Sequence, residues 1–145
     1  MHAPDRGAIA ELSREEIDAF LRTQRVARLG CHADGLTYVV PVIYAYDGGC
    51  VHAVTTEGQK VAMMRANPRV CVEVDEYDAD GRGSWRSVIA YGAFEELGDD
   101  AAAGTLALLR ERFARAPAGE GPRDLGGVVV FRVRLDELTG RAVTR

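Results

Sequence analysis

Lysine is almost missing from this chain of 145 residues: Lys60 is the only one, against seventeen arginines. Cysteine is also scarce. Cys31, Cys50 and Cys71 are odd in number, widely spaced and set in apolar strand patterns, which indicates reduced core residues rather than a disulfide framework. No apolar run approaches the roughly 18 residues of a membrane span. A net charge of −4 predicts no attraction to nucleic acid or to an anionic membrane surface.

Targeting and metal-binding signals are missing as well. The first residues lack the apolar stretch of a secretion signal, so we expect a cytoplasmic protein. His2, His32 and His52 lack the spacing of metal ligands, although Cys50 and His52 share one strand face, and no metal site is predicted. The sequence also has no P-loop, no nucleophile elbow and no convincing nucleophile–base pair.

What the chain does contain is a series of short strand patterns, interpreted as one domain over residues 1–145. A capping-box sequence predicts a helix over 13–22. Apolar alternation and turn residues predict strands over 25–32, 37–46, 50–55, 69–77, 85–97 and 128–135. A long helix is expected over 99–115, followed by a loop over 116–127. Most strands are joined by tight turns, so the pattern favours antiparallel pairing and a mainly-β barrel with flanking helices.

The turn that contains Lys60 is the most informative segment. It leads from a strand into a short helix, and its polar residues are Thr55, Thr56, Gln59 and Lys60. Such a turn presents free backbone N–H groups and the positive end of the helix dipole, which favours a bound phosphate. A structural alternative remains, because Thr56 and Gln59 also match a capping box. Glu57 opposes a phosphate unless its carboxylate points away.

Two further segments combine groups that suit a planar ligand. At the start of a long strand, Trp85 and Ser87 alternate with Arg86, so the aromatic ring and the guanidinium lie on opposite faces. The alternative is a tryptophan at the rim and a solvated arginine. In the second strand, Pro41 removes a backbone donor, which implies an edge, a bulge or a ligand against the backbone. The tyrosines around it are interpreted as core or interface residues.

Together these segments resemble those of the FMN-binding split-barrel proteins related to pyridoxamine 5′-phosphate oxidase, including the nitroimidazole-resistance type. The resemblance covers about residues 12–143. It is carried by the order and spacing of YVVPVIYAYDGG, EGQKVAMMRANPRVCVEVDE, WRSVIAYGAFEEL and FRVRLDELTGRAV. It implies a six-stranded, antiparallel Greek-key split barrel that forms a homodimer with two FMN sites at the subunit interface.

The same resemblance implies which residues contact the cofactor. Backbone groups of one strand would lie along the flavin, the turn before the short helix would hold the phosphate, and the partner subunit would supply the start of the long strand. In that order the residues are Pro41, Val42, Ile43 and Tyr44; Thr55, Thr56, Gln59 and Lys60; and Trp85, Arg86 and Ser87.

This chain departs from the family pattern at two places. It ends in LTGRAVTR and so lacks the basic and aromatic segment with which pyridoxamine phosphate oxidases bind their substrate, which argues against pyridoxal formation. Proteins of the nitroimidazole-resistance type carry a histidine in the strand before the phosphate turn. Here that position is Ala53, with His52 beside it on the opposite strand face.

The function predicted from the sequence is an FMN-dependent oxidoreductase that acts on a small molecule by hydride transfer at the flavin N5. NADH and NADPH are the candidate electron donors, and no catalytic acid or base stands out. One alternative is a deazaflavin-dependent reductase, although a longer polyanionic cofactor would want more basic residues than this turn has. Another is a barrel that binds a flavin or haem without turnover.

Overall fold

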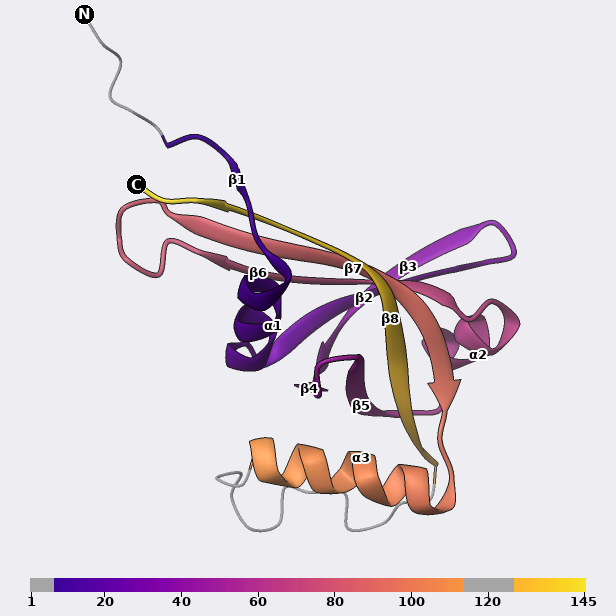
Figure 1. The fold of residues 1–145 in the computed structure, drawn as a ribbon. Coiled ribbons are helices and arrows are strands. Elements are labelled where there is room, and N and C mark those ends of the chain that lie inside the picture. Colours follow the sequence, from indigo (N-terminus) through magenta and orange to yellow (C-terminus); the bar gives the residue numbers. More distant parts are fainter. Residues whose placement is uncertain (1–6, 114–126) are drawn as a thin grey trace, which may run out of the picture.

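The computed structural model describes residues 7–113 and 127–145. In chain order the elements are β1 (Ala10–Glu11), α1 (Arg14–Thr23), β2 (Val26–Ala33), β3 (Leu36–Ile43), β4 (Ala45–Tyr46), β5 (Cys50–Thr56), α2 (Gln59–Ala66), β6 (Arg69–Tyr77), β7 (Trp85–Glu96), α3 (Asp99–Arg112) and β8 (Val128–Val143). The strands form one sheet in the order β3-β2-β6-β7-β8-β5-β4, with β1 beside β8, and every pair is antiparallel. This sheet curls strongly (Figure 1), and the mainly-β antiparallel prediction is confirmed.

The described residues form eight strands, where the sequence predicted six. The predicted strand 37–46 is divided into β3 and β4 at Tyr44, whose N–H donates to the carbonyl of Arg25. The two-residue strand β1 was not predicted, because only its pairing with β8 makes it a strand. The last strand continues well past residue 135, to Val143.

A β-bulge explains why the length of β8 was underestimated. Tyr91 pairs with Glu137 but Gly92 pairs with Leu135, so Asp136 is left out of the ladder and the alternation of faces breaks there. The two strands approach closely at this point. A Cβ atom on Gly92 would collide with the backbone carbonyl of Arg134, so a residue without a side chain is required.

The helices cover the open parts of the curled sheet. The capping box predicted for α1 is confirmed, with Ser13 as N-cap and Glu16 completing the exchange of hydrogen bonds. Helix α3 contacts β4, β5 and β8, and α2 contacts β2 (Figure 1). The predicted end of α3 at 115 and the loop over 116–126 lie outside the described residues. Among the described helices, none is long and apolar enough to cross a membrane.

The core lies between the concave face of the sheet and the helices. Its largest fully buried side chains are Tyr44, Phe20, Phe131, Leu21, Leu29 and Met64. Both methionines of α2, Met63 and Met64, are buried in this core. All three cysteines are free; Cys31 and Cys50 are buried, whereas Cys71 is half-buried.

The ionisation of Tyr46 should make the free energy of unfolding decrease with pH in the alkaline range. Burial and the hydrogen bond that its hydroxyl donates to Asp18 Oδ1 (2.6 Å) raise the pKa of Tyr46 to about 12. An unfolded tyrosine titrates near pH 10. The protonated form is therefore favoured by folding, so this stabilisation is complete below about pH 10 and is lost as the pH rises through about 12. Urea unfolding across this range should show a clearly smaller loss in Tyr46→Phe; an identical loss would contradict the assignment.

Candidate functional site

The Lys60 turn has the free donors that a phosphate requires. Gly58 is the N-cap of α2, and no side chain caps this helix end. The capping role that the sequence allowed for Thr56 is therefore wrong, since Thr56 is the last residue of β5. The first N–H groups of a helix have no partner within the helix, and here they lie beside the half-buried Lys60. The donors and the ammonium group together can hold an anion.

The negative charge of Glu57, which could repel an anion at this turn, is paired with Arg65. Arg65 Nη1 and Nη2 donate to both oxygens of Glu57, at 3.0 and 2.7 Å. Arg65 also donates to Glu96, so one guanidinium is shared by two carboxylates. These bonds hold the negative charge of Glu57 against α2, away from a ligand at the helix start.

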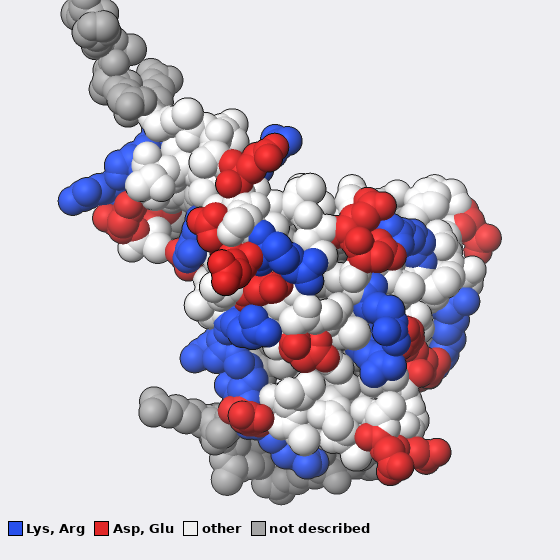
Figure 2. Space-filling model, viewed as in Figure 1, with Lys and Arg blue, Asp and Glu red and all other residues white. Residues whose placement is uncertain are grey.

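Lys60, in contrast, has no ion-pair partner in the part of the chain that the structure describes. Many arginines do have one: Arg14, Arg28, Arg65, Arg69, Arg86, Arg132 and Arg134. On the face seen in Figure 2, blue basic and red acidic side chains are interspersed. The ammonium of Lys60 acts on Cys31, where burial raises the pKa of the thiol and the lysine charge partly opposes the rise. Lys60 is thus a cation available to a ligand.

The other residues predicted at this turn lie on both sides of the helix start. Thr55 is half-buried and Thr56 exposed at the end of β5, where they pair with Val129 and Val128 of β8. Gln59 is exposed as the first residue of α2. The four predicted turn residues are therefore brought together by the chain itself.

The segment predicted to lie along the cofactor is on the edge strand β3, as Pro41 indicated. Its side chains alternate: Pro41 and Ile43 are exposed on the convex face, whereas Val42 and Tyr44 are buried. The hydroxyl of Tyr44 donates to the carbonyl of Leu21 at 2.7 Å, which occupies that side chain in the core. Only backbone groups and the two outward residues of this segment can face a ligand. β3 contacts β5, so this segment lies near the Lys60 turn.

The third predicted segment lies at the end of β7 that is away from the Lys60 turn. Trp85 begins β7, opposite Tyr77 and Val143, where the long ribbon of β6, β7 and β8 reaches the C-terminus (Figure 1). The other end of β7 reaches α2, because the N–H of Phe94 donates to the carbonyl of Pro68. The strand between Trp85 and Phe94 spans about 30 Å at roughly 3.3 Å per residue. One chain therefore does not bring Trp85 and Lys60 together.

Within this segment, Arg86 lies on one face of β7 and contacts its own subunit, whereas Trp85 and Ser87 lie on the other face. Arg86 lies over the ring of Phe20, at 4.5 Å from its centroid, and forms an ion pair with Glu76. Its guanidinium is therefore engaged inside its own subunit. Trp85 and Ser87 are half-buried and, by the alternation of β7, point to the convex face.

The convex face of β2, β3, β6 and β7 is the main feature that the sequence did not reveal. It exposes several large apolar side chains: Val26, Val39, Ile43, Ile89 and Tyr91. The register places these residues and Pro41 on one side of the sheet. A cavity of about 570 Å³ lies among them, lined by residues that include Arg28, Val39, Cys71, Glu73 and Tyr91. Alternation within each strand could have found these residues singly, but only the pairing puts them on one surface.

Glu73 gives this cavity an unsatisfied polar group. Burial and the nearby charge of Asp75 raise the pKa of Glu73, and Arg28 only partly opposes the rise. Arg28 Nη1 lies closer to Asp75 (2.9 Å) than to Glu73 (3.5 Å). Glu73 Oε1 is buried without a hydrogen-bond partner. A hydrogen-bond donor from another molecule that enters this cavity could therefore bind Glu73.

Comparison with known proteins decides the family. The profile of the pyridoxamine 5′-phosphate oxidase family matches residues 13–142. The chain belongs to this family. An uncharacterized protein of Rhizobium meliloti (strain 1021) is 31% identical over 147 residues, covering 90% of this chain and 93% of the relative.

Solved structures of the family confirm the split-barrel architecture. The crystal structure of an FAD-binding protein from Mesorhizobium loti superposes with a TM-score of 0.77 and 35% identity, covering 94% of this chain and 99% of that one. A candidate 5-nitroimidazole antibiotic resistance protein from Bacteroides thetaiotaomicron has a TM-score of 0.74 at 17% identity, covering 98% of this chain and 96% of that one. The second similarity concerns the fold alone.

Proposed function

We propose that this protein is a homodimeric flavoprotein that binds FMN and uses it for redox chemistry on a small molecule. The observation that carries the proposal is the Lys60 turn: a helix start without a side-chain cap, an ammonium group with no ion-pair partner among the described residues, and a neighbouring carboxylate held away by Arg65. A relative that is 35% identical and named as FAD-binding supports a flavin at such a site.

The positions of the predicted contacts support the proposed homodimer. The strand with Pro41, β3, contacts β5, which leads into the Lys60 turn, whereas Trp85 lies at the end of β7 away from α2. A ligand as short as FMN touches both groups only if a second copy supplies Trp85 and Ser87. The exposed apolar residues and the cavity of the convex face offer a surface for that second copy, since monomers rarely expose contiguous apolar patches of this kind.

FAD is the second candidate cofactor, favoured by the Mesorhizobium loti relative. Both flavins carry a phosphate on the ribityl chain, and Lys60 can hold it in either case. FAD has an adenosine in addition, which must lie beyond the turn. Mass spectrometry of the flavin released from purified protein distinguishes the two.

The bound flavin would supply hydride transfer at its N5. The chain itself would bind the phosphate through Lys60, orient the ring against the backbone of β3 and exclude water with the partner's β7. We assign no acid or base, since Tyr44 is engaged in the core and Ala53 occupies the position of the histidine found in the nitroimidazole-resistance type. NADH and NADPH are the electron donors to test first; a flavin that neither reduces under anaerobic conditions would indicate a binding protein without turnover.

A mixing experiment tests the shared site directly. We expect Lys60→Ala and Trp85→Ala to bind FMN weakly when each is purified alone. After the two are mixed and allowed to exchange subunits, each mixed dimer has one site with both changes and one site with neither. Tight FMN binding should therefore return in part. If tight binding does not return although mixed dimers form, Lys60 and Trp85 of different subunits do not share a site.

A further inference from the structure

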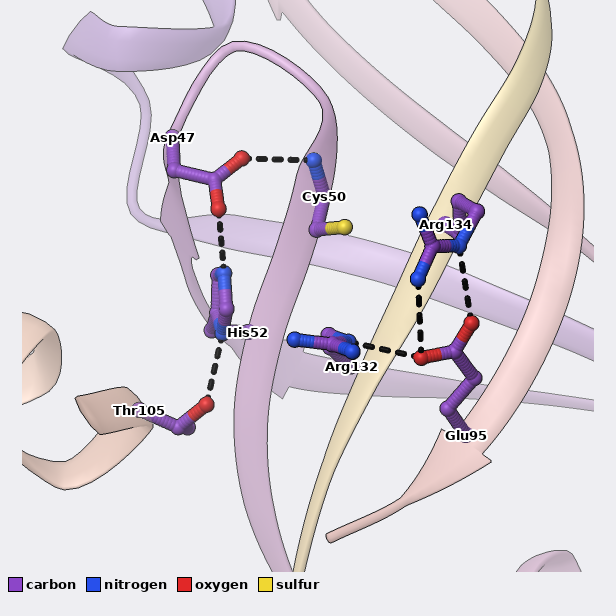
Figure 3. Close-up of polar contacts among 7 residues, drawn as sticks. All are labelled: Asp47, Cys50, His52, Glu95, Thr105, Arg132 and Arg134. Atoms are coloured by element: carbon purple, nitrogen blue, oxygen red, sulfur yellow. Dashed lines mark hydrogen bonds and ion pairs between the residues drawn. The ribbon is translucent and has the colours of Figure 1, made fainter. Parts of the chain in front are cut away.

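Three metal-ligating side chains meet at the turn between β4 and β5 (Figure 3). Asp47 follows β4, while Cys50 and His52 lie two residues apart on β5. One ligand atom from each of the three lies within 4.8 Å of the other two. The other end of β5 leads to the Lys60 turn, so this cluster is separate from the proposed phosphate site.

One ring nitrogen of His52 is hydrogen-bonded to a neighbouring side chain, an arrangement that is usual for histidines that bind a metal. The side chain is buried, with 4% of its surface exposed, and its Nδ1 lies 2.6 Å from the hydroxyl of Thr105 on α3. Thr105 itself is 1% exposed. The other ring nitrogen, Nε2, faces Asp47 Oδ2 at 2.7 Å. Hydrogen bonding of one imidazole nitrogen to an oxygen fixes the ring so that the other nitrogen can bind a metal.

Asp47 is oriented by the turn. Its Oδ1 accepts hydrogen bonds from the backbone N–H groups of Gly49 (2.9 Å) and Cys50 (2.7 Å), which leaves Oδ2 on the side of His52. The Asp47 side chain is 37% exposed, so an ion can reach the cluster from solvent past this carboxylate.

Cys50 supplies the third donor. Its side chain is buried, with 9% exposed, and the thiol has no disulfide. Two positive groups that act on the Cys50 thiol are Arg132 and Arg134 on β8, and both donate to Glu95, at 2.7 and 2.8 Å (Figure 3). Glu95 therefore offsets part of their positive charge, which would otherwise oppose a cation.

We propose that Asp47, Cys50 and His52 bind a divalent ion of the zinc class. An oxygen, a sulfur and an imidazole nitrogen are the ligands that Zn²⁺ accepts together, and with three protein ligands a fourth position is left for water. On binding, the ion takes the place of the Cys50 thiol proton, which goes to solvent, while His52 binds through Nε2 as a neutral imidazole whose single ring proton is on Nδ1, facing Thr105. The thiolate and the carboxylate then balance its two positive charges.

Cobalt provides the test, because Co²⁺ replaces Zn²⁺ and a Co²⁺–thiolate bond gives a charge-transfer absorption band. The full chain, stripped of metal, is titrated with CoCl₂ and then with ZnSO₄. We expect one Co²⁺ per chain, a thiolate band, and loss of that band when Zn²⁺ is added. Thr105→Val should weaken Co²⁺ binding by roughly 10- to 100-fold, because it removes the oxygen behind Nδ1.

Two cysteine variants locate the band. Cys50→Ser should abolish it, whereas Cys71→Ser, a thiol on the convex face, should leave it unchanged. Circular dichroism establishes that each variant is folded. The proposal is overturned if the native chain takes up no Co²⁺ at micromolar concentration, or if the band survives in Cys50→Ser. In either case the Asp47–His52–Thr105 hydrogen bonds only fasten α3 to the barrel.

Discussion

Lys60→Ala is expected to weaken FMN binding by roughly 10- to 100-fold. A hydrogen bond to a charged group contributes about 1.5–3 kcal/mol, and each 1.4 kcal/mol is about a factor of ten in Kd. Lys60 has no competing ion pair among the described residues, so its ammonium group is free to make this contact. The backbone N–H groups at the start of α2 remain in the variant, so binding should be weakened rather than abolished. Fluorescence quenching of FMN by protein stripped of flavin measures the change.

Two controls make this result specific to the phosphate. Riboflavin lacks the phosphate, so its affinity should be the same for the native protein and for Lys60→Ala. Arg110→Ala removes one positive charge from an exposed position on α3 and should leave FMN binding nearly unchanged. Equal losses for FMN and riboflavin would show that Lys60 acts on folding or on the ring site. Tight FMN binding by Lys60→Ala would remove the phosphate assignment.

Val39→Asp is expected to convert the proposed dimer to monomers and to remove tight flavin binding with it. Val39 is 61% exposed in the single chain and lines the cavity of the convex face. A carboxylate buried without a partner costs several kcal/mol, which is more than about 100-fold in the dimer dissociation constant. Flavin binding should fail because Trp85 of the second copy no longer reaches the site.

Sedimentation and FMN titration on the same sample separate these two effects. Ala107→Asp adds the same charge at an exposed position of α3 and should leave both the dimer and FMN binding intact. At high concentrations of Val39→Asp, residual dimer and residual FMN binding should rise together. A monomeric Val39→Asp that binds FMN as tightly as the native protein would show that one chain holds the whole site.

Several local features were predictable because the residues that form them are close in sequence. The capping box at Ser13 depends on residues three apart, and both of its hydrogen bonds form. The Asp34-Gly35 pair is a residue combination that favours a tight hairpin turn, and both residues have positive φ, at 53° and 78°. The alternation of β7 correctly placed Trp85 and Arg86 on opposite faces.

Other features were decided by strand pairing. The sequence ended the last strand at residue 135, because the bulge at Asp136 breaks the alternation on which that prediction depended. Thr56 matched a capping box, yet the pairing of Thr56 with Val128 keeps it in β5 and moves the helix start to Gly58. Where a local sequence pattern fits either a strand end or a helix cap, the hydrogen bonds to the neighbouring strand decide which of the two forms.

By itself the sequence predicted most of the helices and strands, the antiparallel mainly-β class, the family and the position of the Lys60 turn. Each of these depends on neighbouring residues or on the order of motifs. Tertiary structure alone decided that Arg65 holds Glu57, that Trp85 lies about 30 Å along β7 from the region of α2, and that Thr105 backs His52. These contacts join residues far apart in the chain, and their geometry exists only once the sheet has curled and the helices have packed on it.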